Sequence, residues 1–278
     1  MERRIIQTAG FNNIAETREG WMIYNKNDSY IGKSLELYGE YSYKEKLLLK
    51  QLLNHGDTII ELGANIGALT IPISKIIGSR GKLFALEPVR LIFQMLCGNL
   101  AINSCSNTYC YNVGAANQTI QKSCLNIDYN SKSNYGSVDI KNIPKGTSEI
   151  INIIRLDDLL YKELEKLKLI KIDIEGMELE AIKGANQIIN TFRPIIYIEN
   201  DRKDKSKQLI ETIAALNYKL YWHLVPLFSI HNFAKNQINI FKEEGSVNML
   251  CIPQEHPISL VDFKEVTDSS YHPIFSNS

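Results

Sequence analysis

The sequence has no excess of charge of either sign, because its 278 residues include 31 Lys and Arg and 31 Asp and Glu. Proteins that hold a nucleic-acid backbone carry a basic excess or a basic stripe. Neither is visible here, so we expect no nucleic-acid partner. The chain is long enough to bury the core of one sizeable domain.

Long apolar runs and paired cysteines are also missing. No stretch approaches the roughly 20 apolar residues that a membrane-spanning helix needs. The five cysteines are odd in number and form no Cys-x-x-Cys pair, which argues against a disulfide framework and against a zinc site. We therefore expect a cytoplasmic protein with reduced thiols, no membrane span and no bound metal.

The most informative stretch is residues 57–70, which read DTIIELGANIGALT. Its apolar first half is typical of a parallel strand that is buried on both faces, and Glu61 is out of place there. Burying a charge without a partner costs several kcal/mol, so this carboxylate needs a partner. Gly63 and Gly67 allow a sharp turn and a close ligand approach, and the N–H groups of the following helix point to the same place.

Two cofactors compete for this loop. The dinucleotide fingerprint wants glycine at three positions that here hold Gly63, Asn65 and Ala68, so NAD matches at one position of three. The pattern Glu-x-Gly-x-Asn-x-Gly, from Glu61 to Gly67, instead resembles the first motif of class I S-adenosylmethionine-dependent methyltransferases. That resemblance implies that the acid holds the amino group of the methionine part of the cofactor.

A second acid follows at the expected distance. Glu87 ends the predicted strand 82–86 and lies 24 positions after Gly63, where an acid would bind the two hydroxyl groups of a ribose. We also place Ala115, in the turn that closes a third strand at 108–113, beside the cofactor.

Alternating strands and helices predict an α/β fold with a mostly parallel sheet and helices on both faces. We expect an N-terminal extension at 1–40 and one cofactor-binding domain at 41–278. Within this domain, 119–154 is interpreted as a hairpin excursion and 218–246 as an insertion on the substrate side. Further strands are predicted at 167–173 and 194–200.

More distant motifs make the resemblance specific. Three motifs follow the glycine loop in the sequence: LDDL at 156–159, KIDIEGME at 171–178 and KGA at 183–185. Together with the loop they resemble the FkbM family of S-adenosylmethionine-dependent methyltransferases. The match runs from about residue 39 to residue 253. It implies a Rossmann-like sheet with a last antiparallel strand, for which 248–253 is the candidate, and O-methylation of a sugar, glycan or natural product.

Candidate groups for binding the methyl acceptor lie at the end of the predicted fourth strand, 167–173, and in an aromatic segment at 218–236. A methyl acceptor needs a base or an orienting group, and Asp173 at the end of the fourth strand is the first candidate, for contact with the cofactor as well. His223 is the second candidate base. A metal held by Asp173 and Glu175 is not the first choice, because oxygen ligands are too few. The predicted substrate-binding residues are Glu175, Trp222, His231 and Asn232.

Three alternatives stay open from the sequence. They are N-methylation of an amide or amine, an NAD(P)-dependent oxidoreductase that would lack a Tyr-x-x-x-Lys pair, and an inactive binding module on the same fold. A small-molecule or glycan acceptor is expected, and an oligomer is compatible with the sequence.

Overall fold

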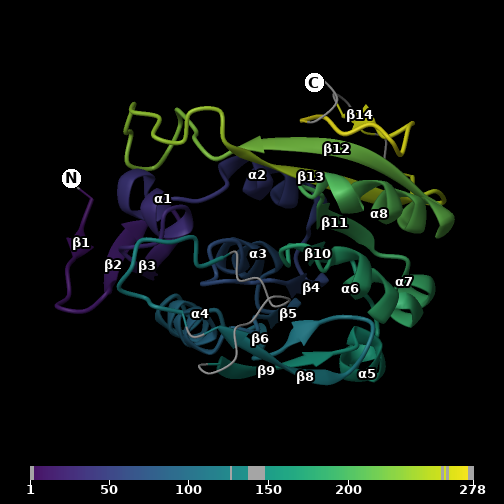
Figure 1. Ribbon diagram of the computed structural model, residues 1–278, viewed down its shortest axis with the longest axis horizontal. Helices are drawn as coiled ribbons and strands as arrows, with labels where there is room; N and C mark the ends of the chain where they lie inside the picture. The colour runs from purple at the N-terminus through teal and green to yellow at the C-terminus, as the bar shows by residue number, and fades with distance from the viewer. Residues whose placement is uncertain (1–2, 126, 137–147, 258–259, 261–262, 275–278) are drawn as a thin grey trace.

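The central element of the computed structural model is one twisted sheet. The structure describes residues 3–125, 127–136, 148–257, 260 and 263–274. Within these, the sheet has eight strands, in the order β14-β12-β13-β11-β10-β4-β5-β6 (Figure 1). Their bounds are β4 Thr58–Leu62, β5 Lys82–Leu86, β6 Thr108–Tyr111, β10 Leu169–Ile172, β11 Ile195–Glu199, β12 Tyr218–Pro226, β13 Gly245–Pro253 and β14 Lys264–Glu265.

Five adjacent strands, from β6 to β11, run parallel, and β13 pairs antiparallel with β11. The predicted parallel sheet and its antiparallel strand near the C-terminal end of the match are thus both confirmed. Parallel strands need crossover connections, and the intervening helices supply them.

Helices cover both faces of this sheet. Their bounds are α1 Ile31–Tyr38, α2 Tyr43–Leu52, α3 Thr70–Ile77, α4 Arg90–Ile102, α5 Leu156–Leu160, α6 Glu178–Gly184, α7 Asn186–Phe192 and α8 Lys203–Ala215, with a short 3-10 turn at Tyr161–Glu163. Successive side chains of a strand point to opposite faces. Ile60 accordingly packs in the core formed with α5 to α8, and Ile59 packs in the core formed with α2 and α3. No described helix is long and apolar enough to cross a membrane.

Two smaller sheets flank the central one. Antiparallel strands β1 Ile5–Ile6, β2 Asn12–Thr17 and β3 Gly20–Asn25 form the first, next to α1 and α4 in Figure 1. The side chain of Asn99 on α4 exchanges two hydrogen bonds with the backbone of Ile23, which fixes this sheet against the main domain.

The second small sheet contains β7 Gly114–Ala115, β9 Ser148–Ile154 and β8 Ile120–Leu125. Strands β8 and β9 belong to the predicted excursion at 119–154, of which 126 and 137–147 lie outside the described residues, whereas β7 precedes it. A bridge between Asp28 and Ser133 joins the excursion to the N-terminal part of the chain. These two segments, far apart in sequence, therefore meet over the ends of the central strands.

One expectation about the fold needs correction. Residues 218–226 form β12, a strand of the central sheet paired with β13 along its whole length, and not part of an insertion. Its side chains alternate between buried and exposed positions, with Tyr218 and Leu220 buried and Lys219 exposed. This two-residue period is the mark of a strand, and the aromatic composition of the segment obscured it.

Candidate active site

A cavity of about 330 Å³ lies at the carboxyl ends of β4, β5 and β10. Open α/β sheets bind ligands at this edge, and the volume falls within the range of small-molecule sites. The strands contribute its floor. Tyr30 and Ile31 from the N-terminal part, together with Asn134 to Gly136 of the excursion, contribute to its wall.

The glycine loop follows β4 and takes backbone conformations that favour glycine. Gly63 has φ +80°, and a Cβ placed there would lie 1.8 Å from the carbonyl oxygen of Asp173. Gly67 has φ +90°, and Asn65 between them has φ +49°. The loop therefore packs directly against the end of β10, and its backbone lies open to the cavity without an intervening side chain.

Glu61 lies on β4 beneath this loop and is 1% exposed. Its Oε2 atom has no hydrogen-bond partner among the described residues. Burial raises the pKa of Glu61 to about 7, although Lys171 and the Thr70 hydroxyl favour the ionised form. A buried carboxylate oxygen that faces a cavity without a partner fits a ligand that carries an N–H cation.

Glu87 lies 5% exposed at the end of β5 and holds the loop from the other side. Its two oxygens accept the backbone N–H groups of Asn65, at 3.1 Å, and of Val89, at 2.8 Å. Burial raises the pKa of Glu87 to about 7 in spite of these bonds. Each oxygen keeps a lone pair toward the cavity, which suits a pair of hydroxyl groups.

An apolar pocket lies beside Glu87. Pro88, Val89, Ile92, Val113 and Ala115 line this part of the cavity. Such a surface suits the flat face of an aromatic base.

Asp173 follows β10 and accepts a hydrogen bond from the ammonium group of Lys171 at 3.3 Å. Burial by itself would lower the pKa of Lys171, but the carboxylates of Asp173, Glu45 and Glu61 raise it above its ordinary value. Lys171 is 3% exposed, so it acts as a fixed positive charge under this part of the cavity. Asp173 keeps its second oxygen for another partner.

Glu175 lies on the same rim and has φ +56°. Its carboxylate accepts a hydrogen bond from Arg202 at 2.8 Å, and Arg202 also pairs with Asp201 at 3.3 Å. This rim is therefore a network of charges on the connections that follow β10 and β11. Among the described residues no group of three His, Cys, Asp or Glu side chains is arranged to hold a metal ion.

The structure brings seven of the residues predicted from the sequence into the lining of one cavity: Glu61, Gly63, Asn65, Glu87, Ala115, Asp173 and Glu175. Gly67 lies in the same glycine loop but not in the lining.

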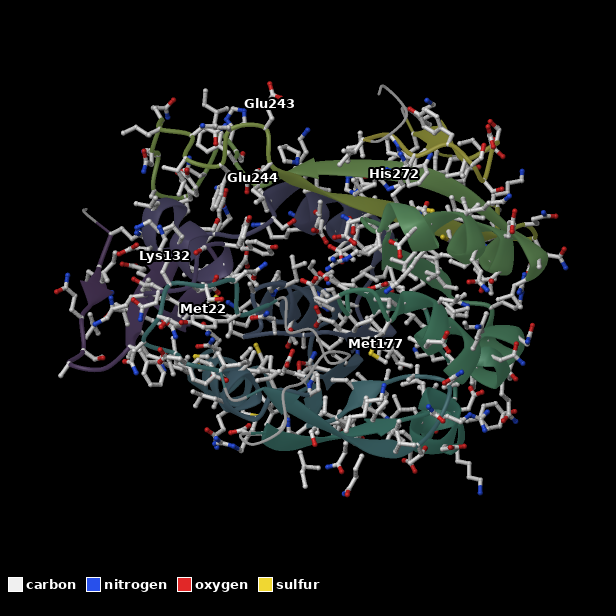
Figure 2. All side chains as sticks on the ribbon, in the orientation of Figure 1. Met22, Lys132, Met177, Glu243, Glu244 and His272 are labelled. Atoms are coloured by element: carbon white, nitrogen blue, oxygen red, sulfur yellow. The ribbon has the colours of Figure 1, made fainter. Side chains whose placement is uncertain are left out.

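The structure does not bring the four residues of the aromatic segment to the lining. Trp222 and His223 are neighbours on β12 and therefore point to opposite faces of the sheet. The Trp222 ring packs against that of His272, which Figure 2 labels at β12. The cavity lies elsewhere in this view, near the labelled Met177, which lines it. His223 Nδ1 lies 2.9 Å from the Tyr197 hydroxyl.

The other two residues of that segment hold the loop that follows β12. The carbonyl of His231 accepts a hydrogen bond from Arg18, and the side chain of Asn232 bonds the backbone of Ser229 and Asn236. Only Leu227, Gly245 and Ser246 of the predicted insertion line the cavity.

Sequence reasoning missed several residues of the site, namely Tyr41, Glu45, Lys171, Glu199, Asp201 and Arg202. Lys171 had a usable signal, because a charged residue inside the apolar run of β10 is as anomalous as Glu61 in β4. Glu45 had none. Ser42-x-x-Glu45 has the spacing of a capping box, but in the structure the Ser42 hydroxyl donates to the Glu45 carboxylate at 2.6 Å and caps no backbone group.

The sequence profile of the methyltransferase FkbM domain matches residues 61–220, which is more than half of the chain. A comparison with curated proteins gave no match. A crystal structure of the methyltransferase FkbM from Methylobacillus flagellatus KT is 18% identical, with a TM-score of 0.48 over 72% of this chain. The chain covers 44% of the length of that protein.

Two further solved structures are similar to this chain at low identity. An O-methyltransferase from Bacillus cereus in complex with SAH is 15% identical, with a TM-score of 0.48 over 79% of this chain and 86% of its own. Fibrillarin from Aeropyrum pernix, with natively bound S-adenosyl-L-methionine, is 15% identical, with a TM-score of 0.43 over 90% of this chain and 99% of its own.

Proposed function

The chain belongs to the FkbM methyltransferase family, and on this premise we propose that it transfers a methyl group from S-adenosylmethionine to a hydroxyl group of a sugar, glycan or natural product. The observation that carries the proposal is the unpartnered Oε2 atom of Glu61 under the glycine loop. An amino-acid ammonium group would supply the missing donor. A nicotinamide dinucleotide has no such group.

The residues of the cavity fit the rest of this cofactor. Glu61 would bind its ammonium group, Glu87 its ribose hydroxyls, and the apolar pocket around Val89 and Ala115 its adenine. S-adenosylmethionine would supply a methyl group on a positively charged sulfur, and transfer to a hydroxyl leaves S-adenosylhomocysteine (SAH) and a methyl ether.

Asp173 is the candidate base that would accept the proton of the acceptor hydroxyl group. A hydroxyl group is a poor nucleophile until its proton leaves, and a placed base adds about 10²–10⁴-fold to the rate. The Lys171 ammonium holds Asp173 by one oxygen, so the other can accept the acceptor proton or orient it. Most of the remaining rate comes from holding the acceptor in line, which is worth up to about 7–11 kcal/mol.

Carboxylates dominate the cavity wall, and this supports a small-molecule or glycan acceptor over a nucleic acid. Seven acids line the cavity against two cations, Lys171 and Arg202; the acids are Glu45, Glu61, Glu87, Asp173, Glu175, Glu199 and Asp201. A phosphate backbone would be repelled there. N-methylation remains the second candidate, because a carboxylate can also take a proton from an amine.

Thermal unfolding with SAH, with NAD and without ligand tests the proposal. SAH should raise the unfolding temperature and NAD should not, because ligands stabilise the folded state that binds them. Transfer of labelled methyl groups to a panel of hydroxyl compounds then separates an enzyme from an inactive module. Stabilisation by NAD alone would contradict the proposal.

The pKa of Glu61 predicts that SAH binds more weakly in acid. The free carboxyl group takes up a proton as the pH falls through about 7, and an ammonium ligand binds its ionised form. Affinity should therefore fall on the order of tenfold between pH 8 and pH 6. Calorimetry at the two pH values checks this. The Glu61→Gln variant should bind weakly and lose the share of the dependence that Glu61 causes, whereas Glu87, whose pKa burial also raises to about 7, should keep its own share.

The stability of the free protein should change in the opposite direction. The folded pKa of Glu61 lies above that of the unfolded chain, so its contribution is complete at low pH and is lost as the pH rises toward 7. The increase in unfolding temperature caused by SAH should consequently be larger at pH 8 than at pH 6. An equal increase at both pH values would contradict the role of Glu61.

Glu87→Ala should weaken SAH binding by about 1.5–3 kcal/mol, because charge-assisted hydrogen bonds to two hydroxyl groups are lost. The same substitution frees the N–H groups of Asn65 and Val89, so the loop should also become more mobile. Calorimetry gives the affinity, and hydrogen exchange at Asn65 reports on the loop. An affinity equal to that of the wild type would remove Glu87 from the site.

Activity should survive EDTA, because the described acids of the cavity are not arranged as a metal site. Methyl transfer measured before and after dialysis against EDTA checks this. Complete loss of activity that magnesium or manganese restores would refute the expectation.

A further inference from the structure

The acceptor side of the cavity holds more carboxylates than the chain's own cations engage. Lys171 bonds Asp173, and Arg202 pairs with Glu175 and Asp201. On this side of the cavity, Glu45 and Glu199 form no ion pair with the described residues, and the Glu45 carboxylate accepts a hydrogen bond from the Ser42 hydroxyl.

Glu199 differs from Glu45 because one of its carboxylate oxygens has no hydrogen-bond partner among the described residues. It is the last residue of β11, and its Oε2 atom is buried without a hydrogen-bond partner among the described residues. Burial raises the pKa of Glu199 well above its ordinary value, and the negative charges of Asp173 and Asp201 raise it further. The charge of Glu199 also raises the pKa of Arg202, but the Arg202 guanidinium forms its ion pairs with Glu175 and Asp201, and Glu199 Oε2 stays without a hydrogen-bond partner among the described residues.

The cofactor does not provide the missing donor. Its ammonium group belongs to Glu61 on β4, and β10 separates β4 from β11 in the sheet. The sulfonium has a positive charge but no N–H, so it cannot fill the free acceptor on Glu199. A divalent metal would need several oxygen ligands, and the described residues provide no group of three.

An aromatic ring lies in the same part of the cavity. Tyr41 lines it, and burial together with the negative charges of Asp173, Glu45 and Glu199 raises the pKa of its phenol well above the ordinary value. These three carboxylates are thus the charges that act on the ring, and they line the same cavity as Tyr41. Ring faces attract organic cations, and a ring next to a carboxylate is a suitable site for a protonated amine.

We propose that the acceptor carries a protonated amine, and that Glu199 and Tyr41 bind this amine while Asp173 meets the hydroxyl group that is methylated. The inference rests on the proposed function and narrows its substrate class to amino sugars and hydroxylated amines. Glu199 would then select the acceptor through charge and would not take part in the transfer itself.

The test compares a matched pair of probes on the protein saturated with SAH. Glucosamine carries a protonated amine, and N-acetylglucosamine is its neutral counterpart. Saturation-transfer NMR titrations should show glucosamine binding at least about tenfold more tightly, the effect expected of a charge-assisted hydrogen bond. The preference should disappear in Glu199→Gln, which keeps the shape, and should be retained in Glu199→Asp, which keeps the charge.

Glu163→Gln is the matched control, because this exposed acid in the 3-10 turn lies outside the cavity lining. It should leave the preference unchanged. Equal binding of the two probes, binding of neither, or an undiminished preference in Glu199→Gln would overturn the inference while SAH binding keeps the proposed function intact. Dependence of probe binding on added magnesium would also overturn it, in favour of a metal. Failure of SAH itself to bind would overturn the proposed function and this inference together.

Discussion

Asp173→Asn should lower kcat by at least about a hundredfold and leave SAH affinity near that of the wild type. The substitution keeps the size of the side chain and removes the group that would take the acceptor proton. Lys171 loses one partner but stays close to the carboxylates of Glu45 and Glu61, so the site should keep its shape. Steady-state kinetics with calorimetry of SAH binding separates the two effects.

Asp204→Asn is the matched control for this variant, because Asp204 lies exposed in the first turn of α8 and outside the cavity. It should leave kcat and SAH affinity unchanged. An orienting role for Asp173 would instead give a smaller loss that is spread over kcat and KM. Loss of SAH binding in step with activity would show that Asp173 belongs to the cofactor site and not to the acceptor.

Gly63→Ala should abolish SAH binding and lower the free energy of unfolding by about 2–5 kcal/mol. A positive φ costs a side chain about 1–2 kcal/mol, and overpacking adds about 1–3 kcal/mol. The new Cβ would lie 1.8 Å from the carbonyl oxygen of Asp173, so the loop and the end of β10 must move apart. Chemical denaturation and calorimetry measure the two losses.

Gly56→Ala separates the clash from the backbone strain. Gly56 has φ +87°, but a Cβ there would meet nothing within 4 Å. This variant should lose only about 1–2 kcal/mol and bind SAH normally. Similar losses in both variants would mean that the loop does not depend on its close contact with β10.

Much of the site could be predicted because the signal lay in anomalies of charge and glycine. Glu61, Glu87 and Asp173 each stand at or next to the end of an apolar strand, and strands β4, β5 and β10 are neighbours in the sheet. The carboxyl ends of parallel strands meet at one edge, so three acids far apart in sequence were expected together, and all three line the cavity.

The acceptor side could not be predicted in the same way. Trp222 and His223 were grouped by composition, but a strand separates adjacent side chains by its pleat, and they end on opposite faces of β12. Glu45 reaches the cavity from α2, whose packing no local pattern encodes. Glu199 ends the apolar strand β11 and carried the same signal as Glu61, but it was missed. Long-range packing, and not local propensity, decided this half of the site.

A crystal structure with SAH tests the central claim most directly. The account predicts the amino group of SAH within about 2.7–3.2 Å of the Glu61 carboxylate, with the ribose hydroxyls at hydrogen-bond distance from Glu87 and the sulfur facing Asp173. SAH bound elsewhere, or bound in this cavity with its amino group away from Glu61, would contradict the account.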